Sequence, residues 1–306
     1  MKPLALISFL LCAGLSSADL HRAGQTPSAL LADSVRSAMR NTAGTALVLD
    51  VESNQILAAE RPELAAHTLA TPGSTLKPFF LLAALQGGAM PDSERVYCRR
   101  SLRVAGRPTN CVHPPIGHAF DAREALAYSC NTYFAELASR LYAQRGGARV
   151  AEIVRARGLD HPSTLIPEAA QGKIRTPQSA AQAQLLALGV EGITTSPLSL
   201  AEAYRELALE ITRPDAAPAA HVVAAALEDS VRFGMADSAR VAGIRIAGKT
   251  GTASAIEGSA THGWFAGYAP ADKPRILVVV FLPHGRGADA ARCAGAIFAA
   301  WSGRLA

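Results

Sequence analysis

Three short polar segments, in a fixed order along the chain, constrain this sequence more than any other feature. They are Ser74-Thr75-Leu76-Lys77, Ser129-Cys130-Asn131 and Lys249-Thr250-Gly251-Thr252. Each pattern alone arises often by chance in a chain of 306 residues. The ordered set is much more specific, because together the three segments supply the hydroxyl, amine and amide groups of a serine-nucleophile site.

The first segment places a serine three residues before a lysine, at the start of an apolar helical stripe. The stripe consists of Leu76, Phe79, Phe80, Leu82 and Leu85 and ends at two glycines. Residues three apart share a helix face, so the Lys77 amine is expected beside the Ser74 hydroxyl. A lysine can act as base only if burial and a nearby cation lower its pKa, and Lys249 could supply that cation. The alternative is a serine that only caps a helix.

The second segment contains Ser129 and Asn131, which are two residues apart and would not share a face of a continuous helix. If both side chains reach one cleft, the chain must break there. Asp121 with Glu124 reads as a capping box that opens one helix, and a second apolar stripe begins at Tyr133. The alternative is one long helix over residues 121–143, since no Gly or Pro marks a break.

The third segment follows an alternating pattern over residues 244–249 that predicts a half-buried strand. Gly248 and Gly251 would let another backbone approach closely, as when a substrate lies against a sheet edge. The alternative is an ordinary glycine-containing strand beside a turn. Only the combination with the other two segments favours a functional interpretation.

With these segments the chain resembles the transpeptidase domain of the penicillin-binding proteins. That domain belongs to the serine-enzyme superfamily that includes DD-carboxypeptidases and serine β-lactamases. The resemblance covers about residues 44–300 and is carried by the stretches 44–50, 72–79, 129–134, 195–201, 247–253 and 262–270. One departure is the turn Gly189-Val190-Glu191-Gly192, where the family usually has a Gly-Gln-Gly-like turn. This difference concerns the shape of one cleft wall.

The resemblance implies a role for each matching residue. Ser74 would be the acylated nucleophile, Lys77 its general base and Ser129 a proton relay to the leaving group. The residues implied for substrate binding are Asn131, Lys249, Thr250, Gly251 and Thr252. Asn131 would hold the substrate amide, and Lys249 with Thr250 would bind its terminal carboxylate. Backbone N–H groups of Ser74 and Thr252 would form the oxyanion hole. No cofactor and no metal are expected.

The function implied is a penicillin-binding serine DD-transpeptidase that acts on peptidoglycan stem peptides through an acyl-Ser74 intermediate, with β-lactams as covalent inhibitors. A DD-carboxypeptidase would differ only in using water. A β-lactamase must deacylate fast; Glu168 could serve in that role, although a solvated loop acid is the preferred interpretation, and a class D-like enzyme would use a carbamylated Lys77. A non-catalytic β-lactam-binding or scaffold domain is the third alternative.

The order of expected elements predicts an α+β fold. A helix over residues 28–39, a hairpin over 45–60 and strands near 241–252, 262–268 and 275–282 flank a helix-rich middle. We therefore expect an antiparallel, five-stranded sheet flanked by helices, with a mostly helical second lobe and the cleft between them. The expected division is a signal segment at 1–18 and one transpeptidase-like domain at 19–306. Its sheet lobe would span 19–86 and 235–306, and its helical lobe 87–234.

The N-terminus reads as an export signal. A basic end at Lys2 precedes an apolar run of 12 residues, 4–15, and the small residues of Ser16-Ser17-Ala18. Such a run is shorter than the about 20 residues that a bilayer-spanning helix needs. We expect a periplasmic or extracytoplasmic protein, soluble after cleavage; an N-terminal membrane anchor is the alternative. The formal charge is +5, and without a basic run it indicates no nucleic-acid partner.

Export would place the cysteines in an oxidising compartment. Cys98 and Cys111 enclose a polar segment with a turn at its centre, so a disulfide between them is the leading expectation. A zinc site from Cys98, Cys111, His113 and His118 is the weaker alternative, because the spacing lacks the usual close cysteine pair. Cys130 and Cys293 are expected to be unpaired and buried.

Overall fold

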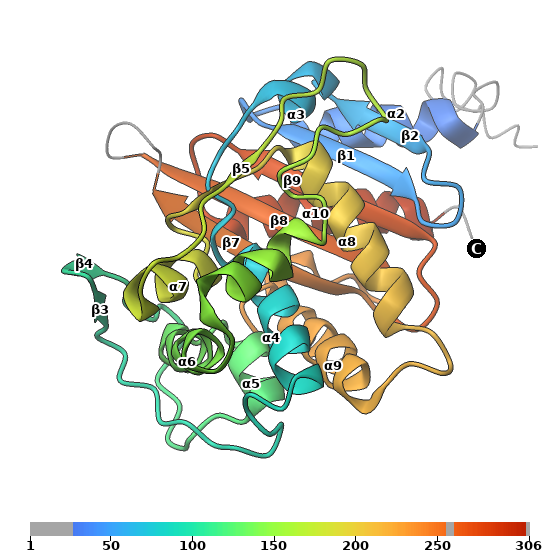
Figure 1. Ribbon diagram of the computed structural model, residues 1–306. Helices are drawn as coiled ribbons and strands as arrows, with labels where there is room; N and C mark the ends of the chain where they lie inside the picture. The colour runs from blue at the N-terminus through green and yellow to red at the C-terminus, as the bar shows by residue number, and fades with distance from the viewer. Residues whose placement is uncertain (1–26, 255–259, 304–306) are drawn as a thin grey trace, which may run out of the picture.

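The computed structural model describes residues 27–254 and 260–303. The expected signal segment, residues 1–18, lies outside this part. Within it, no helix is long and apolar enough to cross a membrane. A five-stranded antiparallel sheet forms the centre of the molecule (Figure 1). Its strands run in the order β2 (Ile56–Glu60), β1 (Thr45–Asp50), β9 (Ile276–Leu282), β8 (Thr261–Ala269) and β7 (Ala247–Ser254). The predicted five-stranded sheet is thereby confirmed.

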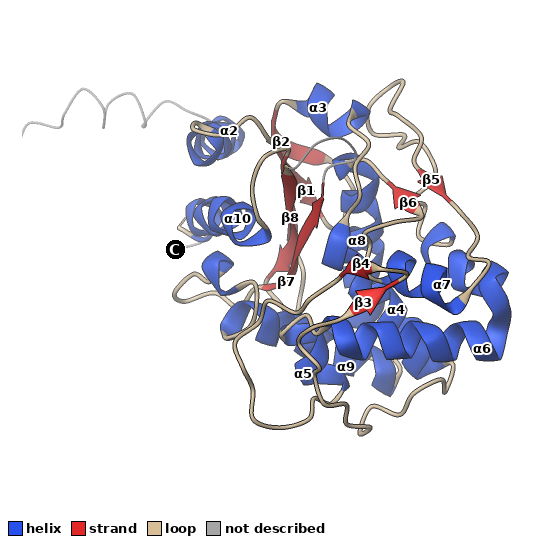
Figure 2. Ribbon diagram, turned by 90° about the vertical axis from the view of Figure 1, so that its left-hand side faces the viewer, coloured by secondary structure: helices blue, strands red, loops and turns tan. Residues whose placement is uncertain are grey.

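Both faces of the sheet are buried, and the two-residue alternation of the strands divides their side chains between two cores. Leu47 and Val279 belong to one core, while Val48 and Val278 belong to the other. Helices α2 (Pro27–Met39) and α10 (Gly287–Ser302) cover the second face, and α8 (Pro197–Ile211) packs on the first (Figure 2). The continuous apolar sequence of β9 is explained by this burial on both faces.

The helix-rich middle of the chain lies on the same side of the sheet as α8 (Figure 2). Its helices are α3 (Pro62–His67), α4 (Lys77–Gln86), α5 (Ala122–Ala127), α6 (Asn131–Arg155), α7 (Ala180–Ala187) and α9 (Pro218–Arg232), with short 3₁₀ turns η1 (Gly73–Leu76) and η2 (Asp237–Ala239). A small hairpin joins β3 (Arg103–Val104) to β4 (Arg107–Pro108). The short strands β5 (Lys173–Ile174) and β6 (Ile193–Thr194), which lie on either side of α7 in the sequence, pair antiparallel. The helix α4 is buried against α5, α6 and α9.

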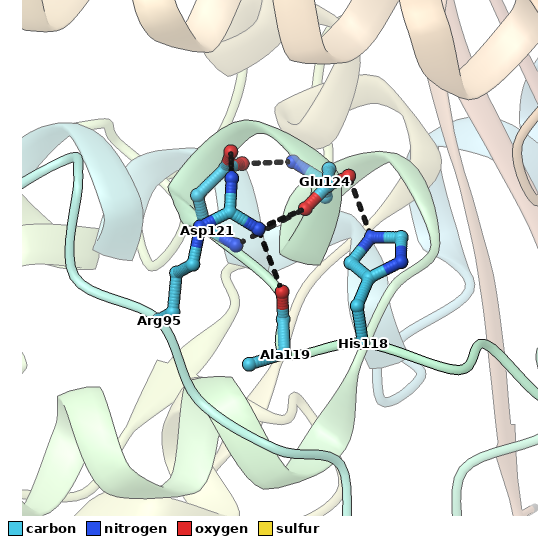
Figure 3. A network of polar contacts seen from close by, with 5 residues as sticks. All are labelled: Arg95, His118, Ala119, Asp121 and Glu124. Carbon is cyan, nitrogen blue, oxygen red and sulfur yellow. Dashed lines mark hydrogen bonds and ion pairs between the residues drawn. The ribbon is translucent and has the colours of Figure 1, made fainter.

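The chain breaks between α5 and α6, so the single-helix alternative for residues 121–143 is wrong. Ser129 has a left-handed backbone with φ of 57°, and Cys130 is extended at the N-terminus of α6. No Gly or Pro marks this break. The predicted capping box at the start of α5 is confirmed, because the Asp121 side chain accepts from the Glu124 N–H and the Glu124 side chain accepts from the Asp121 N–H (Figure 3).

Candidate active site

Ser74 lies in η1, at the head of α4, and is half-buried in a surface cleft. The cleft is lined by Ser74, by residues of β7 and β8, and by residues of the helical middle. They are Ser74, Arg107, Pro108, Thr109, Asn110, Asn131, Leu188, Val190, Thr252, Ala253, Ser254 and Thr261. Three of the predicted site residues, Ser74, Asn131 and Thr252, are therefore brought together from positions far apart in the sequence.

The turn before Ser74 depends on two glycines that no other residue could replace without strain. Gly73 has a left-handed backbone, and a Cβ there would lie 2.9 Å from the Thr252 carbonyl oxygen. Gly189, also left-handed, would place a Cβ 2.1 Å from the Gly73 oxygen. The Gly73 N–H donates to the Gly189 oxygen at 2.9 Å. The segment that contains Ser74 is thus held between β7 and the turn that follows α7.

Buried side chains fix the same segment from the sheet and from α8. The Trp264 indole N–H donates to the Thr71 oxygen at 3.0 Å, and the Tyr204 hydroxyl donates to the Thr75 oxygen at 2.6 Å. Both aromatic residues are fully buried. A buried hydrogen bond with a defined direction restricts the backbone as well as stabilising it, so the position of Ser74 is set by groups on three elements.

Lys77 begins α4 one turn after Ser74, and its N–H donates to the Ser74 carbonyl. Its side chain is fully buried. The Nζ atom donates to the Ser129 carbonyl at 2.7 Å, to the Ser129 Oγ at 3.1 Å and to the Asn131 Oδ1 at 2.5 Å. The amine of the first segment is therefore linked directly to both polar side chains of the second, as the break after α5 permits.

Burial determines the charge of the two lysines of the site. Desolvation lowers the pKa of Lys77 to about 8, against an opposing effect of the nearby thiols Cys111, Cys130 and Cys98. Desolvation and then the charge of Lys77 lower the pKa of Lys249 well below its usual value. A Lys77 amine with a pKa near neutrality can exist in the unprotonated form that a general base requires.

The amide of Asn131 is oriented by the loop that precedes α5. Its Nδ2 donates to the carbonyls of Thr109 at 2.9 Å and Asn110 at 3.1 Å, while its Oδ1 accepts from Lys77. In the sequence, residues 99–110 are only a polar loop between two cysteines, and no pattern in them predicts that residues 107–110 line the cleft.

The third segment is divided between the cleft and the interior. Lys249 is fully buried, and its Nζ donates to the Thr250 oxygen at 3.1 Å. The Thr250 hydroxyl donates to the Met235 oxygen at 3.1 Å, and Thr250 is not among the residues that line the cleft. Thr252 is exposed in the cleft, and its Oγ1 accepts from the Gly287 N–H at 2.9 Å. Accepting that bond leaves the hydroxyl proton of Thr252 available for a ligand.

Gly251 is required by close packing within the protein. A Cβ at this position would lie 2.5 Å from the Pro72 carbonyl oxygen. The backbone that packs against β7 at this point is therefore that of the segment containing Ser74.

The turn that departs from the family pattern forms part of the cleft wall. Val190 lines the cleft, and the Arg107 guanidinium donates to the Val190 oxygen at 3.1 Å and to the Glu191 carboxylate at 3.3 Å. None of the cleft-lining residues in the described part of the chain is an acid. Glu168 is exposed and is not one of them, which gives no support to a glutamate-driven deacylation.

The expected disulfide between Cys98 and Cys111 is not formed, because all four cysteines in the described ranges are free thiols. Cys98 Sγ instead lies 3.3 Å from His113 Nε2, and Cys111 Sγ lies 4.0 Å from Cys130 Sγ. His118 is also placed differently from the expected zinc set, because its Nε2 contacts the Glu124 carboxylate at 2.9 Å (Figure 3).

Comparison with known proteins places this site in a known structural context. The chain is 28% identical over 267 residues to the peptidoglycan D,D-transpeptidase PbpA of Mycolicibacterium smegmatis, covering 76% of this chain and 53% of that protein. It is 26% identical over 285 residues to the peptidoglycan D,D-transpeptidase MrdA of Acinetobacter baumannii, covering 75% of this chain and 42% of that protein. The chain therefore spans about half the length of these relatives.

Solved structures show the same fold. The crystal structure of Pseudomonas aeruginosa PBP2 matches with a TM-score of 0.76 at 21% identity, over 89% of this chain and 76% of that chain. The transpeptidase domain of Burkholderia pseudomallei penicillin-binding protein 3 matches with a TM-score of 0.77 at 21% identity, over 91% and 94%. A family model described as the penicillin binding protein transpeptidase domain matches residues 44–302. This chain therefore belongs to the penicillin-binding protein transpeptidase domain family.

Proposed function

We propose that this chain is a penicillin-binding serine DD-transpeptidase that acts on peptidoglycan stem peptides through an acyl-Ser74 intermediate. The observation that carries the proposal is the buried Lys77, whose pKa is lowered to about 8 and whose Nζ bonds to Ser129 and Asn131, one turn from a serine that lines a cleft. The relatives named D,D-transpeptidases support the same reaction class.

In the proposed reaction, neutral Lys77 accepts the proton of the Ser74 hydroxyl while Oγ attacks the carbonyl of the substrate's penultimate residue. The oxyanion is held by the backbone N–H groups of Ser74 and Thr252, a contribution that is typically worth about 3 kcal/mol per donor. The C–N bond then breaks, and the leaving amine receives a proton through Ser129. An amine of a second stem peptide attacks the ester and releases Ser74 with its proton restored.

Substrate binding is assigned to the polar groups around the nucleophile. The Asn131 amide, held between Lys77 and the 109–110 carbonyls, would contact the substrate amide. The terminal carboxylate would lie near Lys249 and the Thr252 hydroxyl. Contact with a carboxylate would favour the protonated form of Lys249, which burial otherwise disfavours. Thr250 is given no direct contact, because its hydroxyl is bonded to Met235.

The surroundings of the reaction are proposed from the sequence. The segment at residues 1–18 would direct export, and the protein would work at the extracytoplasmic face, where peptidoglycan lies. β-Lactams would acylate Ser74 in place of the stem peptide. Cell fractionation with the native N-terminus, compared with a chain that starts after Ala18, tests export: periplasmic recovery only with the segment is the expected result.

Intact-mass spectrometry with a penicillin tests the catalytic proposal. The wild-type chain should gain the mass of one penicilloyl group and keep it over time. Ser74→Ala should gain none, and Ser302→Ala, at the end of α10 and remote from the cleft, should react as the wild type does. Circular dichroism of each variant confirms that it is folded.

Three results would count against the proposal. Rapid conversion of the drug to its hydrolysed form, without a lasting adduct, would indicate a β-lactamase. An adduct that persists in Ser74→Ala would exclude the assigned nucleophile. A folded wild type that never reacts would favour a non-catalytic domain. Release of D-alanine with and without an amine acceptor then separates transpeptidase from carboxypeptidase.

A further inference from the structure

Four side chains that the proposed reaction does not use converge beside the active site. They are Cys98, Cys111, His113 and Cys130, and their three sulfur atoms and one ring nitrogen all lie within 4.8 Å of one another. Two flank the β3–β4 hairpin, one follows Cys111 by two residues, and the last belongs to the second catalytic segment. Such a gathering of soft ligands from separate segments is typical of a metal site.

The distances fit a tetrahedral ion. With metal–sulfur bonds of about 2.3 Å, the ligand atoms of a tetrahedral zinc site lie about 3.5–3.8 Å apart. Cys98 Sγ and His113 Nε2 are 3.3 Å apart, and Cys111 Sγ and Cys130 Sγ are 4.0 Å apart. All four ligand atoms lie within 4.8 Å of one another. To hold a tetrahedral ion, the first pair would move slightly apart and the second pair slightly together.

The groups around the four side chains prepare them as ligands. His113 Nδ1 lies 2.7 Å from the Pro114 carbonyl, so its proton is held there and Nε2 is left to bind. Backbone N–H groups of Arg100 and Asn131 donate to Cys98 Sγ at 3.3 Å and to Cys111 Sγ at 3.0 Å. Hydrogen bonds donated to sulfur favour the thiolate, which is the form that binds metal.

Most of the cluster is buried. His113 is 1% exposed, Cys130 0% and Cys111 7%. A single disulfide would use two sulfur atoms and leave the third sulfur and the imidazole together in the interior. A closed set of three cysteines and one histidine matches a structural zinc site, with no open position for catalysis.

We propose that Cys98, Cys111, His113 and Cys130 bind one Zn²⁺ ion. The site replaces both the expected Cys98–Cys111 disulfide and the weaker zinc set that contained His118. It also departs from the expectation that the chain binds no metal.

The site has a direct consequence for the catalytic segment. Cys130 lies between Ser129 and Asn131, and Cys111 follows Asn110, whose carbonyl accepts from the Asn131 amide. The ion would join the loop over residues 98–111 to the start of α6 and hold Asn131 between that loop and Lys77. The four ligands thereby act as positioning residues for acylation. This consequence rests on the proposed function, whereas metal binding itself does not.

Metal content of the purified full chain, measured by plasma mass spectrometry after dialysis against metal-free buffer, tests the site. About one zinc ion per chain is expected, as a four-ligand set holds one ion. Substitution with Co²⁺ should give the absorption of a tetrahedral, sulfur-rich site. Cys98→Ser and His113→Ala should lose most of the zinc. The matched controls Cys293→Ser and His118→Asn, which lie outside the cluster, should retain it.

Clear results would overturn the proposal. A wild type without zinc, whose unreduced peptides show a disulfide among Cys98, Cys111 and Cys130, would exclude it. Zinc retained by folded Cys98→Ser and His113→Ala would place the ion elsewhere, and another metal at full occupancy would overturn its identity.

If these variants do not fold, chelation of the wild type decides: removal of zinc should lower the melting temperature, and Zn²⁺ but not Mg²⁺ should restore it. An unchanged melting temperature on removal would contradict a structural ion.

Penicillin acylation of zinc-loaded and chelated wild type tests the link to catalysis. We expect acylation to slow by about tenfold or more without zinc, the scale seen when groups that orient a site are removed, and to recover on adding zinc. Equal rates would overturn the positioning role and leave metal binding intact. Zinc bound without any acylation would contradict the proposed function while the metal site stands.

Discussion

Lys77 shows at the scale of a single residue how burial changes the chemistry of a side chain. In water its amine would be protonated at neutral pH, since the reference pKa is about 10.4. Here it is fully buried, beside Ser129 in the break after α5, Asn131 at the start of α6, the Lys249 amine on β7 and the thiols of the cysteine cluster. Burial outweighs the thiols, and the pKa falls to about 8.

We therefore predict that the rate of acylation by a penicillin rises with pH, is half-maximal near pH 8 and levels off about one pH unit higher. The base must be unprotonated, and the unprotonated fraction of Lys77 increases as the pH passes its pKa of about 8. Lys77→Ala should lower the rate by about 100-fold or more. A stopped-flow assay with a fluorescent penicillin measures both, and Lys273→Ala, an exposed lysine, is the control.

A flat profile through this pH range in the wild type would contradict the role of Lys77 as base. If Lys77→Ala keeps both the full acylation rate and its rise with pH, the rise would belong to another group.

At the scale of an element, the turn after α7 supports the segment that contains Ser74. Gly189 and Gly192 both have left-handed backbones, but only Gly189 is in close contact with another chain segment. A Cβ at Gly189 would lie 2.1 Å from the Gly73 oxygen, whereas one at Gly192 would meet nothing closer than 3.8 Å. Substituting each glycine in turn therefore distinguishes the cost of backbone strain, expected at both positions, from the displacement of η1, expected only at Gly189.

We predict that Gly192→Ala costs about 1 kcal/mol of stability, from the left-handed conformation alone. Gly189→Ala should cost more, because η1 must move, and should also slow acylation of Ser74. Urea unfolding and the penicillin assay measure the two effects. Equal stability losses with unchanged acylation in both variants would show that the Gly73–Gly189 contact does not position Ser74.

The helix α5 offers a second test at this scale. Asp121 caps its N-terminus, with Arg95 and His118 completing the network shown in Figure 3. Asp121→Ala should lower the free energy of unfolding by about 1 kcal/mol, because the Glu124 N–H loses its acceptor. Asp121→Asn should cost much less, since an amide oxygen can cap as well. Unfolding midpoints in urea decide, and an equal loss in both variants would mean that the charge matters and the cap does not.

At the scale of the whole molecule, the buried lysines link stability to pH. The pKa of Lys77 is about 8 in the folded chain and near 10.5 when exposed, so between these values the unfolded chain binds more protons. Stability contributed through this group therefore rises with pH across that window. A shift of this size corresponds to about 3 kcal/mol at most.

We predict that Lys77→Met is more stable than the wild type at about pH 7 and that this advantage shrinks toward about pH 10. Comparing the two at each pH removes the contribution of other titrating groups. Lys273→Met should show a difference that does not depend on pH, because that side chain is exposed. A constant or growing advantage of Lys77→Met would contradict the lowered pKa.

The sequence by itself determined the sheet, the positions of the main helices and the three polar segments that hold the candidate site residues. Strand alternation, apolar stripes and the Asp121–Glu124 cap are local patterns, and each involves residues only a few positions apart in the sequence. The resemblance of those segments to the transpeptidase family identified Ser74, Lys77 and Asn131 as candidates before their geometry was known.

Only the tertiary structure decided what those residues contact. The break at Ser129 has no Gly or Pro, so it depends on packing around a left-handed residue. The Thr250 hydroxyl donates to the Met235 oxygen, and Thr250 does not line the cleft. Cys130 joins Cys98, Cys111 and His113 across the fold. Contacts between residues distant in sequence depend on how the elements pack, which no local pattern records.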